Sequence, residues 1–404
     1  MAVQYDQLGI ALFNDEFIQD PYPLYARMLA GGPVHPICES GFHAVCAWDA
    51  IDEVVGRPED FSSNLTATMT YQDGKVGTFP MGELDGDTQA LATADDPTHA
   101  AHRKLLVPQL AGKRIRALES LVADTEDRLW NEGVHGGVIE WMAAMANRLP
   151  MIIVTRLIGV PDLDADEVMR LGYASTKVVE GLADQDELAV AGTALMELAG
   201  YINEHFQRAA IDAQDNLLGD LATARAAGEL TDLTALNIMA TLFSAGGEST
   251  ASLIGSAAHV LAVRPDIQQR VRENPDLLGT FLEEVLRYEP PFRGHYRHVV
   301  NDTTLSGIDL VAGSRLVLLW GAANRDPSHF DDPNTFRLDR PGKGHIAFGK
   351  GAHFCVGAAL ARLEARIVIG KLLSRTSHIE ATETGRWLPS LLVRRLERLT
   401  LNVA

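Results

Sequence analysis

One cysteine in the segment 348–357 has the surroundings that a reactive thiolate needs. Cys355 stands directly before a stretch with helical periodicity, so its sulfur lies at the positive end of a helix dipole, near unpaired backbone N–H groups. These groups stabilise a negative sulfur, and we expect them to lower the pKa of the Cys355 thiol. Gly349, Gly351 and Gly357 let the backbone turn tightly and leave room for a large planar group against it.

A second candidate site lies in a long apolar stretch, where the segment 243–250 combines small residues with one acid. Gly246 and Gly247 are adjacent there, and each costs a helix about 1 kcal/mol relative to alanine. We therefore expect something to approach this backbone closely, and a flat ligand would do so. Glu248 and Ser249 follow directly and offer a carboxylate and a hydroxyl, two groups that move protons in active sites.

Helices must position these residues, because most of the chain shows a 3.6-residue periodicity. The longest predicted helix begins near the N-cap pair 231–232 and ends at about residue 263, before Pro265. Its roughly 33 residues would span about 50 Å, enough to cross a whole domain. Another helix is predicted over 276–288, with the short apolar alternation of strands confined to small patches elsewhere.

Two such patches, 42–48 and 314–320, follow turn residues and are predicted to be strands. The segment 57–94 has no convincing period and is interpreted as a long loop, either a wall of a ligand site or a surface excursion. No repeat and no linker separates two cores. The fold class is therefore mainly α, with small β-sheets (α+β), in one domain over 1–404.

Composition excludes several classes of function. The chain has 35 Lys and Arg against 54 Asp and Glu, and its formal charge of −19 repels phosphate backbones and anionic membranes. Cys38 and Cys46 are interpreted as small core residues, and three cysteines are too few for a disulfide framework, which favours a reducing cytoplasm. The segment 1–20 has neither the basic start nor the apolar run of a signal peptide or membrane anchor.

The segment from Phe348 to Gly357 resembles the haem-ligand signature of the cytochrome P450 family, Phe-x-x-Gly-x-x-x-Cys-x-Gly. The family's other motifs appear in the same order along most of the chain. The resemblance implies the cytochrome P450 fold with a buried haem b. It also implies that the Cys355 thiolate is the iron ligand, which favours O–O cleavage.

Glu284 and Arg287 lie three residues apart and can pair on one helix face, although most such pairs are only solvated surface. In the family, a Glu-x-x-Arg pair is completed by a later arginine and braces the loop that carries the cysteine. The resemblance assigns this structural role to Glu284, Arg287 and Arg340, with Arg337 as the alternative third member.

The segment 245–250 resembles the element that covers the distal haem face in the family. The resemblance implies that Gly246 contacts the haem and that Glu248 and Ser249 are catalytic residues that relay protons; the alternative is that both only stabilise the helix. The hydroxyl can bond the carbonyl of Ala245, four residues back, and open the helix to water. Serine stands where the family usually has threonine, so we expect a less fixed rotamer and looser coupling of reductant to product.

Haem propionates need cationic or hydrogen-bonding partners. The family supplies them at positions that match four residues here, although each alone would more often be a surface residue. The resemblance therefore implies a cofactor-binding set that also includes Cys355 and its neighbours in the signature: His99, Arg103, Arg297, His353, Cys355, Gly246, Phe348 and Gly357.

The family pattern places the substrate against the loop 66–81, the long helix and two later segments. The expected pocket residues are Phe79, Met81, Leu242, Ala245, Phe292, Arg293 and Leu391. Arg293 and His295 are polar for such a wall. Arg293 either meets an anionic substrate group or turns outward.

The resemblance implies a monooxygenase that hydroxylates a lipophilic small molecule with dioxygen and two electrons. No Gly-x-Gly-x-x-Gly dinucleotide motif is present, so electrons are expected from a separate ferredoxin and ferredoxin reductase. Such an acidic partner would dock near Lys343, Lys350 and Arg362. The enzyme is expected to be a monomer in the cytoplasm.

Two alternatives stay open. One keeps the haem but uses peroxide, or ends in desaturation, demethylation or coupling. The other is a non-catalytic zinc or sensor site at His345, His353 and Cys355.

Overall fold

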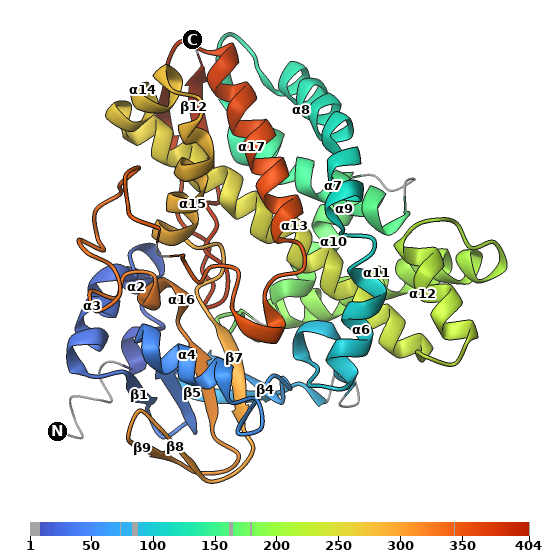
Figure 1. The fold of residues 1–404 in the computed structure, drawn as a ribbon, viewed down its shortest axis with the longest axis vertical. Helices are drawn as coiled ribbons and strands as arrows, with labels where there is room; N and C mark the ends of the chain where they lie inside the picture. The colour runs from blue at the N-terminus through green and yellow to red at the C-terminus, as the bar shows by residue number, and fades with distance from the viewer. Residues whose placement is uncertain are drawn as a thin grey trace.

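The computed structural model describes residues 9–72, 74–82, 88–160, 165–177, 180–342 and 344–403. Helices make up most of this part of the chain. Most of them lie in the upper and right parts of Figure 1, while the largest sheet lies at the lower left beside α3 and α4. The helices are α2 Asp15–Gln19, α3 Tyr22–Gly31, α4 Trp48–Gly56, α6 Thr98–Leu106, α7 Gly112–Ala117, α8 Glu119–Gly133, α9 Arg148–Ile158, α10 Ala165–Thr176, α11 Gln185–Ile211, α12 Leu217–Ala226, α13 Asp232–Val263, α14 Pro265–Glu273, α15 Leu277–Tyr288, α16 Trp320–Ala323 and α17 Ala358–Arg375. Short turns of other helix types are η1 Leu91–Thr93, η2 Met142–Ala146 and η4 Gly351–His353.

The strands form four small sheets. The largest has five strands in the order β1-β2-β10-β7-β3, and β11-β12-β6 form a three-stranded sheet. Two hairpins, β4-β5 and β8-β9, complete the set. The strands are β1 Val34–Ile37, β2 Phe42–Val45, β3 Phe61–Ser62, β4 Ala67–Gln72, β5 Lys75–Pro80, β6 Val138–Glu140, β7 His295–Val299, β8 Thr303–Leu305, β9 Ile308–Leu310, β10 Arg315–Leu318, β11 Ile379–Thr384 and β12 Leu399–Val403. The predicted class of helix-rich fold with small sheets is confirmed.

The loop interpretation of 57–94 is wrong for its middle part, where β4 and β5 pair along their full length. Alternating Thr, Met, Tyr and Val side chains there suit a two-sided hairpin. Asp73-Gly74 between the strands is a strong hairpin turn signal in sequence, and Gly74 has φ +76°. The two predicted strands 42–48 and 314–320 are present in shortened form, because Trp48 and Trp320 each begin a helix instead.

Helix α13 has the ends that the sequence predicts. The Thr231 side chain accepts a hydrogen bond from the Thr234 N–H, and the helix ends at Val263, two residues before Pro265. This helix packs against α9, α15 and α17, and crosses the middle of the molecule (Figure 1). Helix α13 therefore contacts helices on both of its sides.

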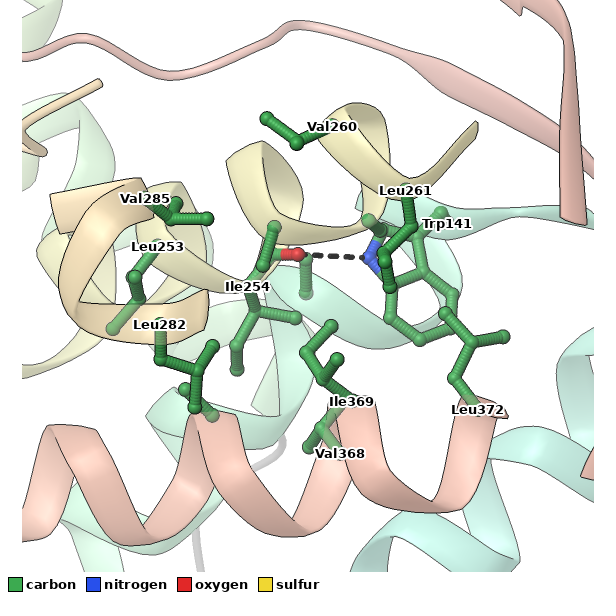
Figure 2. Close-up of a cluster of buried hydrophobic side chains, with 14 of the residues drawn as sticks. Trp141, Leu253, Ile254, Val260, Leu261, Leu282, Val285, Val368, Ile369 and Leu372 are labelled. Carbon is green, nitrogen blue, oxygen red and sulfur yellow. Dashed lines mark hydrogen bonds between the residues drawn. The ribbon is translucent and has the colours of Figure 1, made fainter. Parts of the chain in front are cut away.

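The second half of α13 forms the main hydrophobic core. Leu253, Ile254 and Leu261 pack against α15 and α17, and Trp141 closes the cluster from the other side (Figure 2). The Trp141 indole N–H donates to the Ile254 carbonyl oxygen at 3.3 Å, so this large ring is buried without an unpaired donor. This packing buries most of the second half of α13, while residues from Thr241 to Leu253 also line cavities.

Among the helices of the described residues, none has the length and apolar content needed to cross a membrane.

Candidate active site

A cavity of about 230 Å³, here called the central cavity, lies between α13 and the segment that leads into α17. Its other walls come from α6, α9, β7 and the Pro291-Phe292 segment. Most lining side chains are apolar, and a few are polar, which is the usual composition of a site for a lipophilic ligand. The part of the lining that contains His99, Arg103, Arg297 and His353 is here called the polar end. The segment of predicted chemistry around Cys355 forms part of this lining.

Cys355 lies between η4 and α17, where its N–H donates to the Phe348 carbonyl oxygen at 2.9 Å. Its side chain lines the central cavity. Burial raises the pKa of the thiol, while the backbone N–H groups of Gly357 and Ala358 oppose that shift. The expected lowering of the pKa by the helix end is therefore not observed, because desolvation outweighs it. A thiolate here depends on a bound cation such as iron.

Two different structural reasons explain why glycine occupies the positions around Cys355. Gly349 and Gly351 both have φ +69°, a conformation that favours glycine and folds the chain back beneath the cavity. Gly357 has an ordinary φ of −87°, so a tight turn does not require it. A Cβ on Gly357 would lie 3.9 Å from the Cys355 sulfur, and its absence keeps the space beside the sulfur free.

Four predicted propionate partners do come together at the polar end of the central cavity. The rings of His99 and His353 stack at 3.9 Å, and the Ser63 hydroxyl lies 3.0 Å from His353 Nε2. Arg103 donates to the Phe354 carbonyl oxygen at 2.9 Å and so reaches the cysteine segment.

Arg297 shows that this end fits an anionic group. Among the described residues its guanidinium donates only to the adjacent Tyr296 carbonyl oxygen, at 2.8 Å. Burial lowers the pKa of Arg297 to about 10, while Asp95 opposes the shift. A desolvated cation with unused donors, facing a cavity, suits the carboxylates of a haem.

The first half of α13 forms the opposite wall through Leu242, Ala245, Gly246 and Ser249. The Ser249 hydroxyl donates to the Ala245 carbonyl oxygen at 2.6 Å, as the sequence predicts. Thr250 also lines the cavity, a residue that the sequence analysis did not single out.

Glu248 does not face the central cavity, which corrects the expectation that it covers the distal face beside Ser249. Its side chain is 2% exposed and lines a different cavity on another side of α13, where Oε1 lies 3.3 Å from Arg395 Nη2. Successive residues of a helix are about 100° apart, so Glu248 lies roughly 120° around α13 from the face that Leu242, Gly246 and Ser249 share.

The paired glycines of α13 are explained mainly by helix packing. A Cβ on Gly247 would lie 1.9 Å from the Met151 sulfur on α9, and one on Gly246 would lie 3.0 Å from Val154. The flat ligand expected from the sequence therefore applies only to Gly246, which lines the cavity. For Gly247 the close neighbour is a protein side chain.

The predicted bracing triad is assembled. Arg287 donates to both oxygens of Glu284 at 2.7 and 2.8 Å, and Arg340 Nε donates to the same carboxylate at 3.3 Å. The side chain of Arg337, the alternative third member, instead pairs with Asp332 and Asp339. Both arginines of the triad also donate to the Thr335 carbonyl oxygen, which ties α15 to the chain that leads towards Cys355.

The expected substrate wall is only partly present. Leu242, Ala245 and Phe292 line the central cavity, whereas Phe79, Met81, Arg293 and Leu391 are not among its lining residues.

Arg293 turns neither to the substrate nor to solvent. It is 1% exposed and donates to the Ile18 carbonyl oxygen at 2.6 Å, with its guanidinium 5.5 Å from the centre of the Phe17 ring. Arg293 therefore anchors the N-terminal helices, and the carbonyl group that decides this lies far away in the sequence.

His295 is a polar lining residue with a defined tautomer. The Trp320 indole N–H donates to His295 Nδ1 at 2.6 Å, and because indole only donates, Nδ1 must be the acceptor. Burial lowers the pKa of His295 to about 4, with Arg297 and His353 adding to the shift, so the ring is neutral and Nε2 carries its proton.

The zinc alternative finds no support in the described part of the chain, which contains no group of three or more His, Cys, Asp or Glu residues arranged to hold a metal ion. His345 instead lies 3.2 Å from Glu283 and is not among the residues that line the central cavity.

Comparisons with known proteins agree with this geometry. Residues 194–391 match the family model of cytochrome P450. The chain is 65% identical over 393 residues to cytochrome P450 144 of Mycobacterium tuberculosis, which covers 97% of this chain and 91% of that relative. It is 31% identical over 407 residues to the cytochrome P450 monooxygenase PikC of Streptomyces venezuelae, with 98% and 94% covered.

Solved structures show the same fold over nearly the whole chain. P450BioI in complex with an acyl carrier protein has a TM-score of 0.87 at 26% identity and covers 96% of this chain and 99% of its own. CYP164A2 of Mycobacterium smegmatis also has a TM-score of 0.87 at 26% identity, with 98% and 100% covered. A family model that includes Cys355, a relative at 65% identity and these structures lead to one conclusion: the chain belongs to the cytochrome P450 family of haem b monooxygenases.

Proposed function

We propose that this enzyme hydroxylates a lipophilic small molecule, using dioxygen and two electrons from a separate ferredoxin and ferredoxin reductase. One oxygen atom enters a C–H bond of the substrate, and the other leaves as water with two protons. The observation that carries the proposal is the central cavity itself, which joins apolar walls, a cysteine sulfur and the guanidinium groups of Arg103 and Arg297 in one space.

Haem b, when bound, supplies the iron at which dioxygen is activated. Cys355 would hold that iron, and Arg297, His99, Arg103 and His353 would hold the propionates. The side chains of Leu242, Ala245 and Phe292 exclude water and orient an apolar substrate by shape rather than by charge.

Two groups on α13 are proposed to manage protons. Ser249 presents its hydroxyl to the central cavity while bonded to the Ala245 carbonyl oxygen. Glu248 would pass protons towards Ser249 from the other side of the helix, where its carboxylate is buried and paired with Arg395.

Electrons are proposed to arrive at the surface behind Cys355. Of the three cations expected there, Lys343 lies outside the described residues. Lys350 pairs with Asp52, and Arg362 donates to Glu283 at 2.7 and 2.8 Å, so neither is a free charge. Some of the exposed cations without an ion pair in the described part of the chain lie on α6, α7 and α17, and we propose these as better candidates for an acidic ferredoxin: Lys104, Lys113, Arg116 and Arg366.

The three cysteines are all free thiols, which supports a reducing compartment and the expected cytoplasmic location. We propose that the enzyme acts as a monomer.

The test compares the wild-type protein with Cys355→Ala. The reduced, carbon monoxide-treated wild type is expected to show the red-shifted Soret band of thiolate-bound haem, and Cys355→Ala is expected to lose it completely. A wild-type protein without this band would overturn the assignment of Cys355.

Reaction type is tested with a lipophilic compound chosen because it shifts the Soret band of the wild type. Hydroxylated product is expected with reduced ferredoxin and dioxygen, in a reaction that weakens as salt screens the docking cations. Product that forms equally well with hydrogen peroxide alone, and not with the ferredoxin system, would favour the peroxide-driven alternative.

A further inference from the structure

A second cavity of about 460 Å³, here called the lateral cavity, lies against α13 on the side away from Ser249. It is open to solvent at the start of α11, where Asp186 and Glu187 line its mouth, and its inner end is lined by Glu248. The cavity thus connects solvent with the buried carboxylate that the proposed function uses. The sequence analysis assigned nothing to it.

The inner lining holds two carboxyl groups, Glu180 and Glu248, and two cations, Lys177 and Arg395. Glu180 and Glu248 each have a side chain that is 2% exposed, and the Oε2 atom of each has no hydrogen-bond partner among the described residues. Glu180 Oε2 lies 3.1 Å from Lys177 Nζ, but without hydrogen-bond geometry. Buried polar atoms left without partners are expected to bind water or exchange protons.

Electrostatics makes these two carboxyl groups different. Burial, opposed by Lys177 and Arg395 and helped by the nearby Glu248, raises the pKa of Glu180 to about 7. Near neutral pH, Glu180 is therefore a carboxylic acid in a substantial fraction of molecules. Glu248 differs in its partner, because its Oε1 lies 3.3 Å from Arg395 Nη2.

We propose that Glu180 is the proton-entry residue of this enzyme and that the lateral cavity is the water-filled route from solvent to Glu248. This inference rests on the proposed relay through Glu248. The acid group of Glu180 gives its proton to water in the cavity, and that water gives a proton to Glu248. The Glu180 carboxylate, stabilised by Lys177, then takes a proton from solvent, so no net charge accumulates.

Every charged or titratable group that lines the cavity bears on this step. Lys177 and Glu180 come from the end of α10 and the chain after it, Asp186 and Glu187 from α11, Glu248 from α13, Arg395 from the C-terminal segment, and Tyr173 from α10. Arg395 lies 4.5 Å from the centre of the Tyr173 ring, which helps to hold the guanidinium against Glu248. Arg395 is therefore a positioning residue that keeps Glu248 turned to the lateral cavity.

The experiment measures dioxygen consumption by the haem-loaded protein from pH 6 to 8.5, driven by an excess of a reduced plant-type ferredoxin with its reductase. Glu180 must be protonated to donate, so the wild-type rate is expected to fall as the pH rises through about 7. Glu180→Gln is expected to be about tenfold slower at pH 6, within about twofold of wild type at pH 8.5, and to lose this pH dependence. An unchanged rate and pH profile in this variant would overturn the proposal.

In a second variant, the pH dependence is expected to move along the pH scale rather than to disappear. Lys177→Met removes a cation that lowers the pKa of Glu180, so the falling part of the pH profile is expected to move to higher pH. A profile that stays in place would contradict the assignment of Glu180, whether or not Glu180→Gln folds well.

Two controls separate causes. Glu126→Gln removes another fully buried carboxyl group with a raised pKa, one that pairs with Lys371 and Arg375 and lines neither cavity, and it is expected to keep the wild-type profile. Glu248→Gln is the second control and tests whether protons pass through Glu248 at all. If Glu248→Gln slows the reaction while Glu180→Gln does not, proton entry is elsewhere; if Glu248→Gln has no effect, the relay fails. Peroxide-driven oxidation of guaiacol, which brings its protons with the oxidant, is expected to change less than twofold in the Glu180 and Lys177 variants.

Discussion

The two cavities on either side of α13 differ in the charges that line them. The central cavity has cations at one end, and among its described lining residues the only acid is Glu364, whose pKa burial raises well above its ordinary value. The lateral cavity has four acids and two cations, Lys177 and Arg395. A space with unused positive charge suits a bound anion, whereas a lining that mixes acids with fewer cations suits water and mobile protons. One helix thus separates a place for haem and substrate from a place for protons.

The largest effect that would test this contrast comes from exchanging one buried arginine in each cavity for leucine. Arg297→Leu removes a charge-assisted partner of a haem propionate, a loss of about 1.5–3 kcal/mol or roughly 10- to 150-fold in haem affinity. Arg395→Leu is expected to leave haem affinity within about twofold, because Arg395 contacts Glu248 and Asn147 outside the central cavity. Transfer of haem to an excess of apomyoglobin measures both.

The stability of the haem-free protein provides the check. Arg297 is desolvated and makes one hydrogen bond, to its neighbour in the chain, so leucine there is expected to leave the thermal midpoint unchanged or raise it. If Arg297→Leu lowers that midpoint and haem loss follows unfolding, the guanidinium is structural and the contrast between the cavities fails.

The next largest effect concerns protein stability and the packing of α13, the helix that separates the two cavities. Gly247→Ala would place a methyl group 1.9 Å from the Met151 sulfur, and it is expected to lower the free energy of unfolding by about 1–3 kcal/mol. Gly200→Ala on α11 is the matched control, because a Cβ there meets nothing within 4 Å, and it is expected to stabilise by up to about 1 kcal/mol. Chemical denaturation measures both free energies of unfolding. If Gly247→Ala leaves this free energy unchanged, helix packing does not explain the paired glycines, and a close ligand becomes the better explanation.

Local signals in the sequence predict what local physics determines. The ends of α13 follow from the Thr231 N-cap and Pro265, and the cavity position of Cys355 follows from a motif with fixed spacing. The β4-β5 hairpin was also within reach, because Asp73-Gly74 signals a turn between two strand-like runs. The loop interpretation of this segment relied on its Thr-rich and Gly-rich composition and not on the turn signal.

Long-range contacts decide the rest. Arg293 is drawn to the carbonyl oxygen of Ile18, and Glu248 pairs with Arg395, partners that no sequence spacing relates. The resemblance implied that Glu248 and Ser249 act in one relay within the element over the distal haem face, although the helical period already places adjacent residues about 100° apart. The role of Glu180 depends on burial by three separate segments, which the sequence alone does not indicate.

The smallest effect is expected at Ser249, one of the hydroxyl residues through which α13 lines the central cavity. Ser249→Thr keeps the hydroxyl and its bond to the Ala245 carbonyl oxygen, while the added methyl restricts χ1. Product formed per electron pair is expected to rise by about twofold or less, with a matching fall in released peroxide, because a fixed hydroxyl delivers protons more regularly. Ser249→Ala is the companion variant, expected to lower coupling. Since the lateral cavity contributes no contact to this side chain, the pH profile of either variant should keep the wild-type midpoint, and a shifted midpoint would mean that the two sides of α13 do not act separately.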